Sequence, residues 1–303
     1  MPQSQPHLSF LTHCLTSLLL LNLLSAHQAA HADGNNWMAS IDGRKTISEL
    51  SIPGSHDAGA RFEPLKGTTK CQSLTISEQL DAGVRFLDIR CHNSGNEFSI
   101  YHGPIFQKLT FAQVLDTVCV FLKANPTETV IMSVKEENSS TGATFATIFD
   151  NYVAKSPGIW YLKPTIPTLG AVRGKIVLFR RFAGNEGIQA SSWADNQTFT
   201  NGDLKIEDYY SVPSSDAKWS AVLNHLNAAK TGSNRSLYIS FASGFTTRAT
   251  GVPDILAVSD TVNTQLNSYF QSAATGRYGI ILLDFAEPAL CAKVVATNPA
   301  KTN

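Results

Sequence analysis

The sequence lacks any excess of charge, because its 24 Lys and Arg residues are balanced by 24 Asp and Glu residues and no basic tail or stripe occurs. Proteins bind nucleic acids mainly through clustered Lys and Arg, so the sequence argues against a nucleic-acid partner. It equally gives no support for strong electrostatic attachment to anionic lipid. Internal repeats, low-complexity tracts and interdomain linkers are also missing, and no run after residue 32 is apolar enough to span a membrane. These absences predict one folded domain.

One apolar run does occur near the N-terminus, at Leu15–Leu24. It is short for a membrane span, and Ala30 and Ala32 provide small residues at the two positions that a signal peptidase reads. We therefore expect residues 1–32 to be a secretory signal peptide and residues 33–303 to be an extracellular protein. The N-terminal segment has no Lys or Arg, which departs from the usual signal pattern. An uncleaved anchor is the alternative.

Cysteine is scarce, and Cys14 would leave with the signal peptide. Cys71, Cys91, Cys119 and Cys291 remain, an even number that predicts one or two disulfides in a secreted protein. The sequence does not determine how they would pair. It has no Cys-x-x-Cys motif and no nearby histidine pair, which argues against a zinc site. Four buried free thiols are the alternative.

Apolar, β-rich runs recur along residues 33–303, and several are nearly continuous Val, Ile, Leu and Phe, as in strands buried on both faces. We predict strands at Leu50–Pro53, Val84–Arg90, Phe98–Tyr101, Thr129–Lys135, Lys175–Arg181, Leu204–Tyr210, Leu237–Ser243 and Tyr278–Phe285. Helical patterns occur between many of them, at Ser77–Ala82, Thr110–Lys123, Ala143–Val153, Ser215–Ala229 and Asp254–Gln271. Thr110 and Gln113 form a capping box at the start of the clearest helix. This alternation predicts an α/β fold with a parallel barrel.

Polar residues stand where these strands finish. Such residues are His56, Arg90, His102, Lys135, Arg181, Asp208 and Asp284. The carboxyl ends of barrel strands converge on one mouth, where active sites are built, so we expect these side chains to lie together. Two histidines and an arginine delivered in this way indicate acid–base chemistry on a phosphate.

The ordered set of motifs resembles the bacterial-type phosphatidylinositol-specific phospholipase C family. The resemblance runs from about Ile47 to Asp284, and it rests on Ser51–Asp57, Phe86–Arg90, Tyr101–Pro104, Asn125–Lys135, Arg173–Arg181, Trp193–Phe199, Asp208–Tyr210 and Leu283–Asp284. It implies a secreted enzyme with a single irregular TIM-like (β/α) barrel. The implied reaction is an internal phosphotransfer that releases diacylglycerol and inositol 1,2-cyclic phosphate. Whether the substrate is phosphatidylinositol, a glycosylated inositol lipid anchor or another inositol lipid stays open.

The resemblance also implies roles for five catalytic residues. His56 would be the general base, and Asp284 would orient its ring and stabilise the imidazolium, as an acid does in a serine-protease triad. His102 would be the general acid for the diacylglycerol oxygen, assisted by Asp57. Arg90 would bind the phosphate oxygens, for which its planar, permanently charged fork is well suited.

Substrate binding is implied for four further residues. Lys135, Arg181 and Asp208 resemble the groups that bind the inositol hydroxyls, and Tyr210 resembles the aromatic platform under the sugar ring. Core packing is the alternative for Tyr210 and for Trp193. Asp88 is expected to be a salt-bridge partner at the barrel mouth and not a catalytic group.

No metal or other cofactor is expected. Eukaryotic relatives hold calcium near the phosphate, whereas here Arg90 takes the equivalent place and the mouth offers few spare acids. One alternative is a metal-dependent glycerophosphodiester or sphingomyelin phosphodiesterase, which would need clustered acids after its first histidine, and Asp57 alone is no such cluster. Another is a non-catalytic module that binds inositol headgroups, although such a module would be expected to have lost a catalytic group.

Contact with a membrane is expected to be transient. The two segments predicted to lie at the rim, Arg61–Gln72 and Phe245–Ile255, contain no tryptophan. Only modest, reversible anchoring by their apolar side chains is therefore expected, and we expect a monomer.

Overall fold

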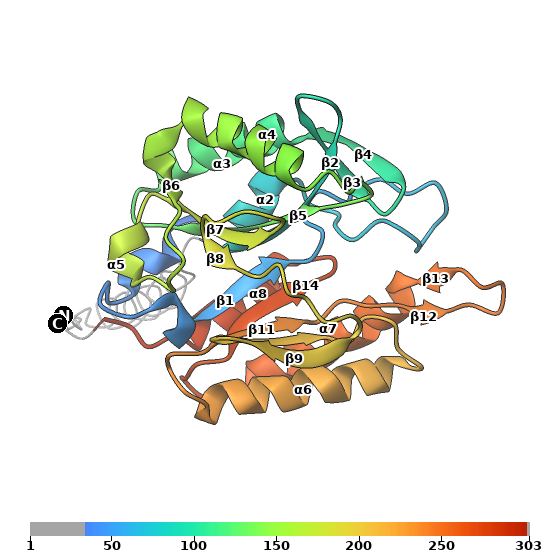
Figure 1. Cartoon of the computed structure of the whole chain (residues 1–303). Helices are drawn as coiled ribbons and strands as arrows, with labels where there is room; N and C mark the ends of the chain where they lie inside the picture. The colour runs from blue at the N-terminus through green and yellow to red at the C-terminus, as the bar shows by residue number, and fades with distance from the viewer. Residues whose placement is uncertain (1–33, 302–303) are drawn as a thin grey trace, which may run out of the picture. The chain divides into compact units, whose positions relative to one another are not determined.

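The computed structural model describes residues 34–301, and the predicted signal peptide lies outside them (Figure 1). All eight predicted strands are present. They are β1 (Ser51–Ser55), β2 (Phe86–Asn93), β3 (Phe98–His102), β5 (Val130–Glu136), β7 (Ile176–Arg181), β10 (Leu204–Asp208), β11 (Leu237–Phe241) and β14 (Gly279–Leu283). The structure adds six short strands. These are β4 (Ile105–Thr110), β6 (Trp160–Tyr161), β8 (Ile188–Gln189), β9 (Gln197–Asn201), β12 (Thr246–Thr247) and β13 (Pro253–Asp254).

The main sheet is an irregular TIM-like barrel. Its order is β6-β7-β5-β2-β1-β14-β11-β10-β9, and every neighbouring pair is parallel except β10 with β9. Within residues 34–301 the two end strands, β6 and β9, do not pair with each other. The prediction for the strand at Phe98–Tyr101 is wrong in detail, because β3 is not one of the parallel strands of the barrel. It pairs antiparallel with β2 and with β4, and so forms a hairpin that extends beyond the barrel.

Helices cover the outside of the sheet, including those over β2 and β5 in the upper part of Figure 1. The five predicted helices are present as α2 (Ile76–Asp81), α3 (Phe111–Ala124), α4 (Ala143–Lys155), α6 (Ser215–Thr231) and α7 (Ile255–Gln271). The predicted capping box of α3 is confirmed. The sequence did not predict five further helices. They are α5 (Leu169–Val172), α8 (Pro288–Ala296) and the 3₁₀ helices η1 (Gly34–Ser40), η2 (Ile47–Glu49) and η3 (Pro157–Ile159). None of the helices described here is both long and apolar enough to span a membrane.

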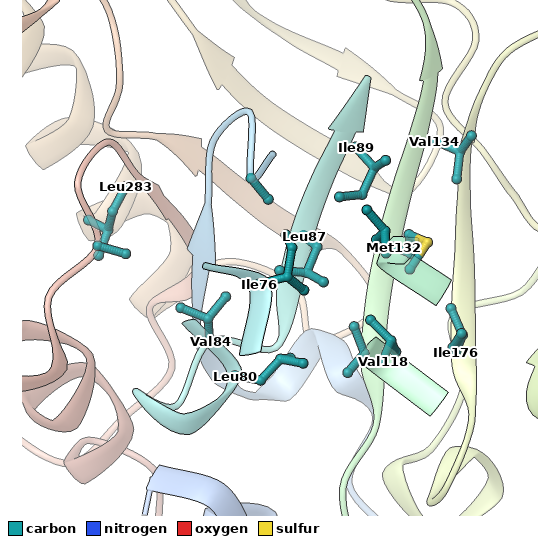
Figure 2. Close-up of a cluster of buried hydrophobic side chains, with 14 of the residues drawn as sticks. Ile76, Leu80, Val84, Leu87, Ile89, Val118, Met132, Val134, Ile176 and Leu283 are labelled. Atoms are coloured by element: carbon teal, nitrogen blue, oxygen red, sulfur yellow. The ribbon is translucent and has the colours of Figure 1, made fainter. Parts of the chain in front are cut away.

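The apolar core forms two layers. Inward-facing residues of the parallel strands, such as Ile52, Phe86 and Ile280, fill the barrel. Outward-facing residues pack under the helices, and Figure 2 shows part of this layer, with Leu87 and Ile89 of β2, Met132 of β5 and Val118 of α3 in one cluster. Parallel strands are buried on both faces in this way because the crossover helices cover the outside of the sheet.

The alternation of side chains along each strand explains where the polar strand ends point. In β2, Phe86 faces the interior and Leu87 faces the helices, so Asp88 and Arg90 share the inward face of Phe86. The same spacing of two residues joins other inward apolar residues to polar ones, namely Phe179 to Arg181, Ile206 to Asp208 and Leu282 to Asp284. The packing pattern of the core therefore directs these side chains to one mouth.

The disulfide prediction is wrong, because Cys71, Cys91, Cys119 and Cys291 are all free thiols. Cys91 and Cys291 lie in the outer apolar layer, and Cys71 belongs to a small separate apolar cluster. These three behave as small buried hydrophobic residues, a common role for free cysteine.

Candidate active site

A cavity of about 470 Å³ lies at the carboxyl ends of the barrel strands. This volume lies within the usual range for small-molecule sites. Eight of the nine predicted site residues line it, namely His56, Arg90, His102, Lys135, Arg181, Asp208, Tyr210 and Asp284. The ninth, Asp57, is fully buried directly behind the cavity wall.

His56 and Asp284 follow directly after the paired strands β1 and β14. Nδ1 of His56 lies 2.8 Å from Oδ1 of Asp284, and Nε2 of His56 lies 2.8 Å from a terminal nitrogen of Arg90. A guanidinium only donates hydrogen bonds, so Nε2 must carry the lone pair and Nδ1–H must donate to Asp284. Burial acts to lower the pKa of His56, but the carboxylate of Asp284 outweighs it, and the net pKa lies above its ordinary value. This is the tautomer and orientation that a general base requires.

His102 reaches the cavity from the end of the β3 hairpin strand. Its Nδ1 lies 2.8 Å from the carbonyl oxygen of Thr69 and therefore carries a proton, whereas the nearest carboxylate oxygen of Asp57 is 3.6 Å from it. The ring centroids of His56 and His102 are 6.4 Å apart, at nearly right angles. Two imidazoles at this separation can reach opposite sides of one phosphate group.

A buried acid–guanidinium network supports the arginines. Nε of Arg90 lies 3.3 Å from Asp88 and 3.4 Å from Asp57, and a terminal nitrogen of Arg181 lies 3.5 Å from Asp88. Burial opposes ionisation of Asp88, but the two guanidinium groups outweigh it and hold its pKa well below the usual range. In Asp57 burial prevails over Arg90 and raises the pKa. The expected salt-bridge role of Asp88 is therefore confirmed.

The opposite wall combines aromatic and charged groups. The guanidinium carbon of Arg181 lies 3.6 Å from the ring centroid of Trp193, and Nε1–H of Trp193 donates to Asp208 over 2.8 Å. Trp193 also packs edge-on against Phe199 and thus serves both the core and the cavity lining. Within residues 34–301, Nε and one terminal nitrogen of Arg181 are buried and make no hydrogen bond. The terminal one is the nitrogen that faces Asp88 over 3.5 Å, so Asp88 holds this side of the guanidinium by charge.

Two cavity residues escaped the sequence analysis. Glu137 accepts from Nζ of Lys135 over 2.6 Å and from the backbone N–H of Gly103 over 3.1 Å. Asp195 accepts from the hydroxyl of Tyr210 over 2.7 Å, a hydrogen bond that raises the pKa of Tyr210 to about 12. Their positions in the sequence could have identified both residues, since Glu137 follows β5 directly and Asp195 lies within the Trp193–Phe199 motif.

The expectation of few spare acids concerns acids that have no protein partner. Four carboxylates line the cavity, those of Glu137, Asp195, Asp208 and Asp284. Each of them accepts a hydrogen bond from a neighbouring side chain, and these donors are Lys135, Tyr210, Trp193 and His56. The acids are therefore committed to protein partners.

Two groups of residues in the described structure bring three metal-ligating atoms together. They are His56–Cys71–Asp284 and Asp57–Cys71–His102. Both need the Cys71 thiolate, yet burial raises the pKa of that thiol well above its ordinary value. Arg90 lies against both groups, and its permanent charge repels a dication. The arrangement fits proton transfer better than metal binding.

Comparison with known proteins identifies the family. The family model "Phosphatidylinositol-specific phospholipase C, X domain" matches residues 45–182, a segment that includes His56, Arg90 and His102. The chain is 32% identical to the 1-phosphatidylinositol phosphodiesterase of Staphylococcus aureus strain NCTC 8325, over 89% of this chain and 91% of that protein. It therefore belongs to the phosphatidylinositol-specific phospholipase C family.

Solved structures support the same relationship. A variant of the phosphatidylinositol-specific phospholipase C from Staphylococcus aureus is similar with a TM-score of 0.77 and 29% identity, covering 88% of this chain and 98% of that chain. The enzyme from Listeria monocytogenes gives a TM-score of 0.74 and 26% identity, covering 88% and 100%. The irregular TIM-like barrel is thus shared with bacterial members of the family.

Proposed function

We propose that this protein is a phosphatidylinositol phosphodiesterase of the phospholipase C type that works by metal-independent acid–base catalysis. The observation that carries the proposal is the arrangement of His56, Arg90 and His102 around one cavity, with the base oriented by Asp284. The family membership of the chain supports the same reaction class.

Each step of the reaction uses an observed group. Nε2 of His56 takes the proton of the inositol 2-hydroxyl, whose oxygen then attacks phosphorus. His102 gives its proton to the departing diacylglycerol oxygen, so that inositol 1,2-cyclic phosphate and diacylglycerol form. In the structure, Arg90 donates a hydrogen bond to Nε2 of His56. A substrate phosphate is a stronger acceptor for a guanidinium than a neutral imidazole, so binding would draw Arg90 away and free the base.

Phosphorus NMR of the products of phosphatidylinositol cleavage, recorded in excess EDTA, tests the proposal. We expect a cyclic phosphodiester signal at an undiminished rate. Loss of activity in EDTA that calcium restores would instead favour a metal-dependent phosphodiesterase. The absence of any cleavage, combined with binding of glycerophosphoinositol, would favour a headgroup-binding module.

Headgroup selectivity should follow from the polar wall. We propose that Arg181, Asp208 and Lys135, joined by Glu137, bind the inositol hydroxyls while Tyr210 packs against the ring. Choline or ethanolamine headgroups would leave these partly buried groups without hydrogen-bond partners. The resulting free-energy cost should strongly lower kcat/KM for such lipids. Assays on phosphatidylinositol, phosphatidylcholine and a glycosylated inositol lipid anchor would test selectivity and distinguish the possible inositol lipids. Comparable rates on phosphatidylcholine and phosphatidylinositol would refute it.

We also propose secretion through residues 1–32 and brief docking to membranes. Three of the four exposed large hydrophobic residues in the described structure lie in two segments, residues 62–69 and 105–110, that contact the cavity residue His102 through Thr69 and Ile105. They are Phe62, Leu65 and Phe106, with exposed fractions of 36%, 52% and 42%. Nζ of Lys108 lies 3.8 Å from the Phe62 ring centroid and joins the two segments. Membrane binding is a property of the similar Staphylococcus aureus enzyme. N-terminal sequencing of the exported protein tests the cleavage site after Ala32.

A further inference from the structure

Gln72 is a fully buried carboxamide that no step of the proposed reaction uses. Its Nε2 donates to the carbonyl oxygens of His56 and Leu283, both over 2.8 Å. Its Oε1 accepts from the backbone N–H of Ala286 over 3.1 Å. One side chain therefore joins the segment that follows β1 to the segment that follows β14.

The hydrogen bonds of Gln72 lie where the β1–β14 ladder ends. The β1–β14 register ends with Ser55 opposite Leu283, and His56 and Asp284 are the next residue on each strand. The last backbone bond between the two strands runs from the N–H of His56 to the carbonyl oxygen of Leu283, over 3.0 Å. The carboxamide of Gln72 extends the connection, because it joins the carbonyl oxygen of His56 to Leu283 and Ala286, which flank Asp284 on the other segment.

Other bonds hold the Asp284 side of this junction. Asn263 of α7 donates from Nδ2 to the carbonyl oxygen of Asp284 over 2.8 Å. The backbone N–H of Phe285 donates to the carbonyl oxygen of Cys71 over 2.6 Å. Phe285 has a φ of +50°, a left-handed conformation that is unfavourable for a bulky residue and needs support from its surroundings.

We propose that Gln72 and Asn263 form a carboxamide clamp that positions the His56–Asp284 pair for proton transfer. Both are positioning residues, because they bind the backbones of the pair and do not touch substrate. The inference rests on the proposed function. Its physical basis is that the reacting groups must be held to a fraction of an ångström, and small displacements cost large factors in rate.

A matched pair of variants tests the clamp. Gln79 is also fully buried, and its Nε2 donates to two carbonyl oxygens, those of Ala58 and Leu74, which do not line the cavity. We expect Gln72→Met and Gln79→Met to lower the melting temperature similarly. Only Gln72→Met should lower kcat, by roughly 10- to 100-fold with KM changed less than about threefold. The acidic limb of its pH–rate profile should also move to lower pH, because Asp284 would raise the basicity of His56 less.

A spectroscopic measurement separates this proposal from the function itself. The Nδ1 proton of His56 should give a downfield proton NMR signal that weakens or moves upfield in Gln72→Met and persists in Gln79→Met. If the wild type cleaves no phosphatidylinositol but the signal responds this way, the function fails and the clamp stands. Equal effects of the two variants on kcat and on the signal would overturn the clamp.

Asn263→Ala provides a second test if Gln72→Met does not fold. Asn263 is only half-buried, so its removal should be tolerated. We expect the same upfield movement of the His56 proton and a smaller fall in kcat, of about threefold to tenfold, because one bond is lost instead of three. An unchanged signal together with an unchanged pH–rate profile would overturn the proposal.

Discussion

The Asp284→Asn substitution is the most direct test of how the base is activated. It keeps the size of the side chain and removes the charge that faces Nδ1 of His56 over 2.8 Å. Unit charges about 4 Å apart interact by roughly 4 kcal/mol at an effective dielectric constant near 20. The imidazolium is only partly formed in the transition state, so half or more of this energy should be lost. We therefore expect kcat to fall by roughly 30- to 1,000-fold.

The pH dependence of the same variant has a defined sign. Burial acts to lower the pKa of His56, and Asp284 raises it to a net value above the ordinary one. A general base works when neutral, so the rate rises as pH increases through this pKa. Removing the carboxylate lowers the pKa, and the acidic limb must move to lower pH.

Steady-state kinetics on phosphatidylinositol vesicles across pH 4 to 9 provide the assay. His225→Ala is the control, because His225 is buried against Ser240 outside the cavity. A fall in kcat of less than tenfold for Asp284→Asn, or an acidic limb that stays in place, would refute the assigned role of Asp284.

Three other expectations concern stability and docking. Burial lowers the pKa of His225 from 6.5 to about 4, so its contribution to stability is present above pH 6.5 and is lost as pH falls. The free energy of unfolding, measured by urea titration, should therefore drop by about 2 kcal/mol between pH 7 and 5. The His225→Gln variant should not show this drop. Lys218→Met should lower the free energy of unfolding by roughly 3–5 kcal/mol, because it removes the ammonium group that lies 2.8 Å from the buried carboxylate of Glu207. Adding Glu207→Met should recover much of this loss in the same titrations. Leu65→Ser with Phe106→Ser should weaken co-sedimentation with phosphatidylcholine vesicles while leaving cleavage of a soluble inositol phosphodiester unchanged, and equal binding would contradict the rim assignment.

Much of the barrel could be predicted from sequence because several parallel strands are nearly continuous apolar runs and the others keep apolar residues at alternate positions. The position of each polar end follows from that pattern, since side chains alternate and Phe86 must face inward. The hairpin strand Phe98–His102 was misplaced for the same reason. An apolar run records burial but not the partner of a strand, and β3 satisfies its backbone against β2 and β4 and not within the barrel.

Loop residues of the cavity could not be predicted in this way. Glu137 and Asp195 lie beyond strand ends, where no periodic pattern fixes the direction of a side chain. Glu137 accepts from the neighbouring Lys135 and from the backbone N–H of Gly103, which follows β3, and Asp195 accepts from Tyr210. The bonds to Gly103 and Tyr210 form only when these separate segments are brought together. Gln72 was overlooked as well, since its partners are backbone groups about 16 and 211 residues away along the chain.

The distribution of hydrogen bonds explains how a cavity rich in acids can accept an anionic substrate. Each acid that lines the cavity accepts a hydrogen bond from a protein donor, and the cations of Arg90, Lys135 and Arg181 in the same lining offset the negative charge. The guanidinium groups are less fully used. Arg181 keeps buried donors without hydrogen bonds in the described structure, and Arg90 donates to a neutral imidazole. In the proposed mechanism, a phosphate that binds Arg90 would draw it away from Nε2 of His56, so binding itself would expose the base.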